Sequence, residues 1–488
     1  MNKFTVLFLF SVILFSFQSA GSQELLSYKK VKTMTKQEIS NSLFIPAKYD
    51  VDVYVIEYTS KKINLKKDTA SGIIAVAKDP KFRFPTAVYN HGTVDNRNDV
   101  PSKGSNEQLF TIAIASYGYH CVAPDYIGLG ISKGVHPYVN PESEAWATID
   151  LIKACHTMSG TEPFYFNDQV FVTGYSQGGH AAMATAFAIE QRNIKGIDSM
   201  VLTAAVPMSG PYSISKEMKA FTLGDTPYNF CAYLGSAFLS AKLAHFDLLG
   251  QTQVEDVFET EYAQLIRKYE SETIGLFAMN DQMVEKLKAN GGKVLPKRML
   301  KNGFYNDFIS NPNNPLQLAL TRMDVSDWVP LAPVTMIYCK SDDQVTYRNA
   351  VYTDSLMKKN GALKVSAIDV FSSGNHGSCF YPAILRMISI FNGLQRIDPL
   401  STTGEITDNI LIYPNPAQSI VNIDLGQSLS EHSLLEVIDM CGKSVFKDFI
   451  YSKNSIYSIN VGSFKQGFYI IKLSHSSGRE LTKKLVIN

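Results

Sequence analysis

The feature that most constrains the fold is a Gly-x-Ser-x-Gly pentapeptide, Gly174–Gly178, set between two different kinds of segment. Residues 170–173 are the β-branched and aromatic type of a buried strand, and the alanine-rich residues 181–186 favour a helix. A strand that passes so directly into a helix must turn sharply, and the flanking glycines let the two backbones approach closely. The pattern predicts that the hydroxyl of Ser176 stands above the sheet as a nucleophile. An ordinary glycine-rich strand-to-helix turn is the alternative.

Short apolar runs alternate with helix-like segments over residues 23–394, which predicts an α/β domain with a mostly parallel sheet. The runs lack the period-2 alternation of half-exposed strands, as expected where helices cover both faces. An antiparallel hairpin at the start of the sheet is predicted where the pattern does alternate, in residues 51–59 and 70–77. The expected parallel strands are 86–90, 120–123, 170–173, 199–206 and 334–338.

A helical block at about 211–328 interrupts this alternation. Within it, residues 228–250 are unusually apolar and aromatic, but Lys242 and Asp247 argue against a membrane span. We interpret the block as a cap over the active site whose apolar residues line a pocket for an acyl chain. The alternative is a set of helices that simply packs on the main domain.

Two further regions follow the α/β domain. Residues 395–409 are polar, with proline and glycine, and are predicted to form a linker. Residues 410–488 then show period-2 runs separated by short turns, which predicts a small antiparallel, immunoglobulin-like sandwich.

Composition limits the classes of partner. The chain has 488 residues, enough for about two or three domains. Its formal net charge is +1, and no basic stripe interleaves with aromatic residues, so nucleic acid is excluded as the partner.

Residues 1–22 have the pattern of a secretory signal peptide. Lys3 precedes an apolar run over residues 4–17, and small residues occupy positions 20–22. The run is too short to span a membrane. We therefore expect an exported protein with no transmembrane span in the mature chain.

Chain order selects one histidine as the base for Ser176. A serine nucleophile at such a turn is followed in the sequence by an acid and then by the base. The late histidines His432 and His475 lie in the predicted sandwich, and His245 lies in the helical block. His376, in a loop after a predicted strand, is therefore expected to take the serine proton and return it to the leaving group.

The acid is expected just after the strand at 334–339, where Asp342 and Asp343 are adjacent. Asp342 has the Asp-x-x-Val spacing of such acids and is preferred, with Asp343 as a solvated neighbour. The chosen carboxylate would accept the imidazole N–H and stabilise the imidazolium that forms during attack.

An oxyanion hole needs two backbone N–H groups directed at the developing charge. We expect one from Gln177, the residue after the nucleophile, and the other from Thr93, with Gly92 as the second choice. His91 has no partner at metal-ligand spacing and is interpreted as a hydrogen-bonding loop histidine. Neither a metal nor a cofactor is expected for this chemistry.

Two of the six cysteines, Cys339 and Cys379, lie next to the predicted acid and base loops. In an oxidising compartment a bridge between them would tie the two loops together. Two independent buried thiols are the alternative.

Residues 48–392 resemble the secretory lipase family, α/β-hydrolases with a helical lid inserted before the seventh strand. The resemblance implies a carboxylic ester hydrolase with Ser176, Asp342 and His376 as its triad. It is carried, in chain order, by Asn90–Thr93, Asp125–Gly130, His136–Tyr138, Gly174–Gly179, Tyr338–Cys339, Asp342–Val345 and Asn375–Gly377.

Residues 410–488 look like the C-terminal sorting domain of the type IX secretion system. This resemblance implies a Gram-negative bacterium of the Bacteroidetes type and a protein that is secreted or attached to the outer cell surface by that machinery. A carbohydrate-binding sandwich is the alternative. The matching segments are Ile412–Ala417, Cys441–Lys443, Gly467–Ile470 and Lys484–Ile487.

The leading hypothesis is an exported serine ester hydrolase, lipase-like, that forms an acyl-enzyme on Ser176 with a small-molecule ester or lipid. A polysaccharide-directed acetyl or feruloyl esterase and a serine peptidase of the same fold are the enzymatic alternatives, because the triad itself does not choose among them. A surface-displayed binding protein on a hydrolase scaffold is the alternative outside enzymes.

Overall fold

The computed structural model describes residues 25–191, 200–400, 411–424, 433–440, 442–450, 456–475 and 480–488. The predicted signal peptide, most of the predicted linker and position 199 of the predicted strand 199–206 lie outside these residues. The chain divides between Leu400 and Ser401 into two compact units, which we describe separately.

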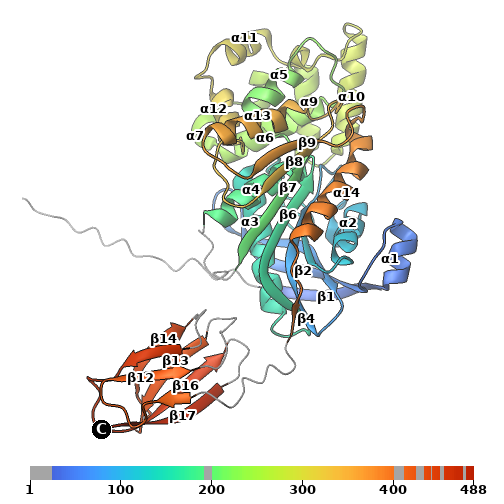
Figure 1. Cartoon of the computed structure of the whole chain (residues 1–488). Helices are drawn as coiled ribbons and strands as arrows, with labels where there is room; N and C mark the ends of the chain where they lie inside the picture. The colour runs from blue at the N-terminus through green and yellow to red at the C-terminus, as the bar shows by residue number, and fades with distance from the viewer. Residues whose placement is uncertain are drawn as a thin grey trace, which may run out of the picture. The chain divides into compact units, whose positions relative to one another are not determined.

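The larger unit is built on one mixed sheet (Figure 1). Its strands run in the order β1-β2-β3-β5-β4-β6-β7-β8-β9, with β10 paired to the start of β4. Neighbours from β5 to β9 are parallel, and β1, β2 and β3 are antiparallel, so the expected mostly parallel sheet and its starting hairpin are both present. The strands are β1 Leu25–Met34, β2 Val51–Lys61, β3 Lys67–Ala77, β4 Phe82–Asn90, β5 His120–Pro124, β6 Tyr165–Tyr175, β7 Val201–Met208, β8 Val334–Tyr338, β9 Val365–Asp369 and β10 Asp398–Pro399.

Strand β1 is absent from the predicted strands. Most of its residues are exposed, so it carries no buried face that would leave a hydrophobic pattern. It is held instead by its ladder with β2 and by Asp52, which accepts hydrogen bonds from Lys30 Nζ at 2.7 Å and Thr33 Oγ1 at 2.6 Å.

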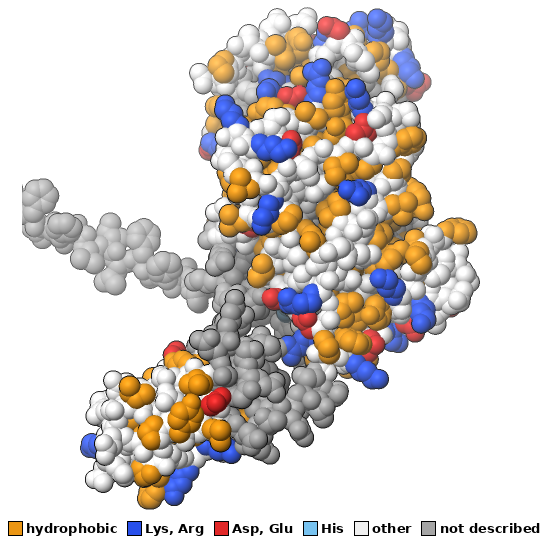
Figure 2. Space-filling view, in the orientation of Figure 1, with side chains coloured by type: hydrophobic (Ala, Val, Ile, Leu, Met, Phe, Trp, Pro, Cys, Tyr) orange, Lys and Arg blue, Asp and Glu red, His pale blue; other side chains and the backbone are white. Residues whose placement is uncertain are grey.

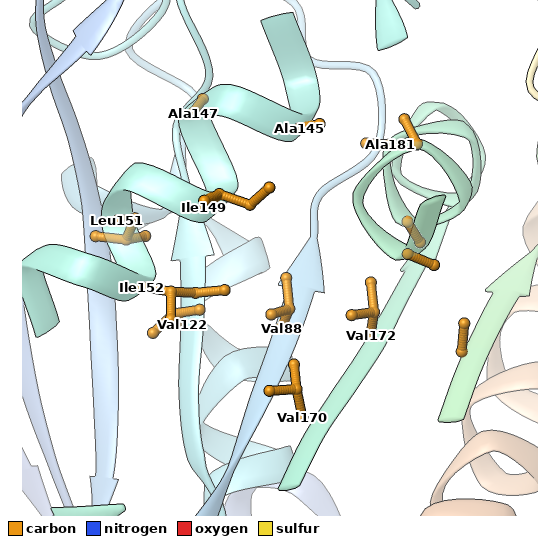
Figure 3. Close-up of a cluster of buried hydrophobic side chains, with 14 of the residues drawn as sticks. Val88, Val122, Ala145, Ala147, Ile149, Leu151, Ile152, Val170, Val172 and Ala181 are labelled. Carbon is orange, nitrogen blue, oxygen red and sulfur yellow. The ribbon is translucent and has the colours of Figure 1, made fainter. Parts of the chain in front are cut away.

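Helices cover both faces of the sheet. One face packs against α3 (Pro141–Met158), α4 (Gln177–Glu190) and α13 (Arg348–Lys359). In Figure 3, Val88, Val122 and Val172 project from β4, β5 and β6 among the side chains of α3 and α4. The other face packs against α1 (Lys36–Leu43), α2 (Asn106–Ala115) and α14 (His376–Leu394). This double cover explains why apolar residues predominate in the central strands and do not alternate with polar ones.

A helical insert separates β7 from β8 and has an apolar core of its own, including Phe238, Phe258 and Ile266. It occupies the upper part of the larger unit in Figure 1. The apolar segment 228–250 forms α6 and α7 within it. Its elements are η2 Ile214–Met218, α5 Lys219–Thr222, α6 Ala232–Ala244, α7 Phe246–Leu249, α8 Val254–Val257, α9 Thr260–Glu270, α10 Leu276–Ala289, η3 Pro296–Met299, α11 Asn302–Ser310 and α12 Pro315–Arg322.

The smaller unit is all-β, as predicted, and consists of two antiparallel sheets around one core that includes Val421, Leu435 and Ile471. One sheet has the order β11-β12-β15 and the other β14-β13-β16-β17. Their strands are β11 Leu411–Tyr413, β12 Ile420–Asp424, β13 Ser433–Asp439, β14 Ser444–Ile450, β15 Ile456–Asn460, β16 Gly467–His475 and β17 Glu480–Ile487.

Among the described residues, no helix combines the length and apolar character needed to cross a bilayer. On the face shown in Figure 2, Lys and Arg side chains are scattered among acidic and hydrophobic ones rather than gathered into a stripe.

Candidate active site

Ser176 lies at the junction of β6 and α4 with φ 60° and ψ −122°, a conformation that an L-residue adopts only where the surroundings impose it. The predicted close approach is present: a Cβ on Gly178 would lie 2.0 Å from the Asn90 carbonyl oxygen. A Cβ on Gly174 would lie 2.2 Å from the carbonyl oxygen of Gly178. No side chain fits at either position, so both residues must be glycine. Ser176 itself has the positive φ that the sharp turn imposes.

His376 and Asp342 are brought together by two loops. His376 begins α14, and its Nδ1–H donates to Asp342 Oδ2 at 2.7 Å. The other oxygen of Asp342 accepts the backbone N–H groups of Gln344 and Val345, both at 2.9 Å. This carboxylate is thus held at both oxygens, and it fixes the orientation of the imidazole ring.

Asp343, the competing acid, contacts the backbone of the same histidine rather than its ring. Its Oδ1 accepts the His376 backbone N–H at 3.0 Å. Asp343 is exposed whereas Asp342 is buried. Only Asp342 therefore has the contact that an acid needs in order to stabilise an imidazolium.

Two further links hold His376 beside the serine turn. The hydroxyl of Tyr175, the residue before Ser176, donates to the His376 carbonyl at 2.5 Å, and the two rings are 4.9 Å apart between centroids. Cys339 and Cys379 form a disulfide, so the bridge and not the pair of free thiols is the arrangement present. The bridge joins the segment after β8, which carries the acid, to the first turn of α14, which carries the histidine.

The loop after β4 packs against the same turn. A Cβ on Gly92 would lie 3.4 Å from the Tyr175 carbonyl oxygen and 3.9 Å from Ser176 Cβ. The neighbouring Thr93 hydroxyl is 3.1 Å from the Tyr138 hydroxyl. Gln177 is the first residue of α4, where backbone N–H groups have no acceptor within the helix. The candidate oxyanion loop and the first turn of α4 therefore meet at Ser176.

His91 forms hydrogen bonds to backbone, with Nδ1 2.7 Å from the Gly92 carbonyl oxygen and Nε2 3.3 Å from that of Asp125. Its ring lies against Tyr126 at 4.3 Å between centroids. No group of three or more His, Cys, Asp or Glu side chains in the described part of the chain is arranged to hold a metal ion.

A buried polar network around Gln177 was not among the predicted site residues. The Gln177 side-chain amide donates to Glu144 Oε1 at 3.0 Å and to His136 Nε2 at 2.8 Å. The other Glu144 oxygen accepts from His180 Nδ1 at 2.7 Å, and His180 Nε2 donates to the Met323 carbonyl at 2.9 Å. The network joins α3, α4 and the end of the helical insert, and it includes Gln177, the residue after the candidate nucleophile.

The pKa values of the two histidines in this network are shifted in opposite directions. Burial would lower the pKa of His180, but the Glu144 carboxylate and the Met323 carbonyl outweigh it and raise this pKa above its usual value. Burial lowers the pKa of His136 to about 4, so its ring is neutral and Nε2 can accept from Gln177. A sequence signal existed for His180, a titratable residue directly before the alanines of α4, but nothing local identified Glu144 as its partner.

Ser176 and Gln177 open into a pocket of roughly 750 Å³, part of it open to solvent, and the helical insert supplies most of its walls. Only the start of the predicted apolar segment lines it, through Tyr228, Tyr233, Leu234 and Phe238. Phe246, from the same segment, is 70% exposed, and Leu249 is buried in the core of the insert. The expectation that 228–250 lines the pocket thus holds for its first half.

Comparison with known proteins agrees with this division of the chain. Residues 411–488 match the secretion system C-terminal sorting domain family. A curated relative, an endo-acting ulvan lyase from Formosa agariphila, is 27% identical over 129 residues. The match spans 24% of this chain and 24% of the lyase, so the chain covers only about a quarter of that relative, whose activity is its own.

The larger unit is similar to solved ester hydrolases. The rice cell wall degrading esterase LipA from Xanthomonas oryzae aligns with a TM-score of 0.66 and 26% identity, over 76% of this chain and 98% of that one. Lipase A from Candida antarctica, in its closed state, aligns with a TM-score of 0.56 over 76% of this chain and 83% of that one; at 15% identity it supports the fold alone.

The fold, the serine turn and these likenesses define an α/β-hydrolase that acts on carboxylic esters. The sorting domain makes it an exported protein of the type IX secretion route, secreted or attached to the cell surface.

Proposed function

We propose that this protein is a serine esterase, lipase-like in its preference for apolar acyl groups, and that Ser176 is its nucleophile. The observation that carries the proposal is the His376–Asp342 contact of 2.7 Å beside the strained serine turn. Because Nδ1 of His376 is bound by the carboxylate, Nε2 is the nitrogen left to accept the Ser176 proton.

In the proposed reaction, Ser176 Oγ attacks the ester carbonyl carbon as His376 takes the hydroxyl proton. The carbonyl oxygen becomes an oxyanion, which would be stabilised by the backbone N–H groups of Gln177 and Thr93. His376 then protonates the leaving alcohol, and an acyl-enzyme remains on Ser176. A water molecule, deprotonated by the same histidine, releases the acid and restores the serine.

The domain organisation is part of this proposal. Residues 1–22 would be removed on export, 23–394 would form the catalytic domain with its cap at about 211–328, and 395–409 would link it to a sorting domain at 410–488. The pocket walls described above support the cap assignment, because the insert contributes residues to the same cavity as Ser176.

Hydrolysis of p-nitrophenyl esters from acetate to palmitate, by the chain from residue 23 onward, tests the proposal. We expect rates that peak at medium or long chains and a loss of roughly 10⁴- to 10⁶-fold in Ser176→Ala, with the fold unchanged. Labelling by a fluorophosphonate should disappear in the same variant. Retention of most activity in Ser176→Ala would refute the assignment.

A polysaccharide-directed esterase is the second candidate, favoured by the likeness to an esterase described as degrading rice cell walls. A rate maximum at acetate, together with release of acetyl or feruloyl groups from plant polysaccharide, would support it over the lipase-like preference. Serine labelling without ester turnover would favour a peptidase, and no labelling at all would favour a binding protein.

A further inference from the structure

Lys219, in α5 of the helical insert, is the charged residue among the described residues that line the pocket of Ser176. The walls of the pocket are otherwise mostly apolar or aromatic, including Leu223, Phe308 and Leu316. A lysine stem can add apolar surface to such a wall, but its ammonium group must be solvated, hydrogen-bonded or paired.

The surroundings of the ammonium group leave it without a counter-charge. Lys219 Nζ donates to the side-chain oxygen of Gln317 in α12 and lies 5.2 Å from the centre of the Phe308 ring. No ion pair joins Lys219 to a carboxylate within the described parts of the chain. Burial lowers the pKa of Lys219, as expected for a cation with neutral neighbours.

Glu217, close to Lys219 in the sequence, and Asp324, just after α12, are both engaged elsewhere. Glu217 lies 3.7 Å from Lys216 Nζ. Asp324 accepts hydrogen bonds from both the backbone N–H and the hydroxyl of Ser215. The ammonium group has three donors, of which Gln317 accepts one. The remaining donors are available to an anionic acceptor that enters the pocket.

We propose that Lys219 forms a subsite for a carboxylate at the far end of the apolar acyl chain, so that esters of a dicarboxylic acid esterified at one end only are substrates of the same pocket. The inference rests on the proposed function, in which the acyl chain occupies this pocket and its ester carbonyl lies at Ser176. The apolar walls contact the methylene chain, and the free carboxylate of the substrate supplies the counter-charge that Lys219 lacks. A charge-assisted hydrogen bond in a half-buried site contributes more than one at the open surface.

The experiment compares p-nitrophenyl hydrogen suberate with p-nitrophenyl octanoate, which have acyl chains of equal length and differ in the terminal carboxylate. The readout is the ratio of kcat/KM for the charged ester to that for the neutral one, in the chain from residue 23 onward. We expect Lys219→Met to lower this ratio roughly ten- to hundredfold. Lys219→Arg should keep most of it, because the positive charge remains.

Gln317→Leu is the matched control, because it removes the neutral partner of Lys219 and keeps the ammonium group. If Lys219 serves only to tie α5 to α12, Gln317→Leu and Lys219→Met will change the ratio equally, and the subsite is refuted. An unchanged ratio in Lys219→Met, with thermal unfolding showing an intact fold, refutes it as well.

Failure of the proposed function has a different signature, since wild type would then hydrolyse neither ester. Calorimetric binding of free suberate and free octanoate to the same chain would still decide the subsite. Tighter binding of suberate that is lost in Lys219→Met supports it, and equal binding in both proteins overturns it.

Discussion

Two histidine–carboxylate pairs flank the serine turn, and they differ in burial and in whether the second ring nitrogen is bound. In each pair, histidine Nδ1 lies 2.7 Å from a carboxylate oxygen: His376 from Asp342 and His180 from Glu144. The His180 and Glu144 side chains are fully buried, and both ring nitrogens of His180 are bound. His376 keeps a side chain 9% exposed, with Nε2 available for proton transfer. Under the proposed function, only the His376–Asp342 pair can take part in proton transfer, because its second ring nitrogen is left free.

The largest expected effect is the loss of turnover in His376→Gln. Removing the proposed base from the serine nucleophile should lower kcat by roughly 10⁴- to 10⁶-fold, and we expect the fold to remain intact. Steady-state hydrolysis of p-nitrophenyl octanoate measures kcat, and a urea unfolding curve measures stability. If this variant keeps its activity, the distinction between the His376 and His180 pairs is wrong.

The next largest effect is a difference in kcat between variants of the two neighbouring acids, Asp342 and Asp343. Asp342→Asn removes the charge that stabilises the imidazolium, and we expect kcat to fall roughly 10³- to 10⁴-fold. Asp343→Asn retains an acceptor for the His376 backbone N–H and should change kcat by less than about tenfold. Equal losses in the two variants would contradict the assignment of the acid.

Glu144→Gln should act on stability. It removes the carboxylate that raises the pKa of His180 and leaves the fully buried ring without its charged partner; breaking a buried pair in this way destabilises a protein by about 3–5 kcal/mol. Chemical unfolding followed by fluorescence measures this change, and Glu142→Gln, an exposed change on the same turn of α3, is the control. Identical unfolding midpoints for the two variants would show that the buried pair carries no net interaction.

A third histidine, His120, should have a smaller effect on stability, and its pKa is shifted in the direction opposite to that of His180. Burial among Phe84, Phe164 and Phe166 lowers the pKa of His120 to about 3, whereas an unfolded histidine titrates near 6.5. Between these values the unfolded chain binds more protons, so the stability falls as the pH drops, by roughly 2 kcal/mol at about pH 5.

His120→Gln keeps a donor for the Tyr165 carbonyl and removes the titration, so its loss of stability on acidification should be shallower. The raised pKa of His180 has the reverse consequence: its stabilisation is complete below about pH 6.5 and is lost as the pH rises through the higher folded pKa. Unfolding curves measured across this range distinguish the two. Parallel pH profiles for wild type and His120→Gln would contradict the account.

The sequence predicted those parts of the site that chain order and local pattern determine. The serine turn is local, since strand, glycines and helix are contiguous, and His376 followed from its position after the acid. Glu144 and His180 lie on two different helices and are 36 residues apart in the sequence, and no periodicity in the sequence encodes such a pairing. Strand β1 was missed for a related reason, because an exposed edge strand is defined by its partner rather than by its own apolar face.

The pocket, too, could be predicted only in part from the sequence. Its apolar character could be predicted from composition, but the distribution of one segment between pocket wall, insert core and surface depends on how α6 and α7 pack. The lysine among its walls gave no signal at all, because Lys219 has the sequence surroundings of an ordinary surface residue.

The Cys339–Cys379 bridge connects the geometry of the candidate site to the export of the protein. Disulfides persist outside the cell and are kept reduced in the cytoplasm. The covalent tie between the acid-bearing segment and the histidine-bearing helix is therefore acquired only after the chain has left the reducing interior. Before export, only non-covalent contacts such as the His376–Asp342 hydrogen bond hold these two segments together, and the exported protein adds the covalent bridge.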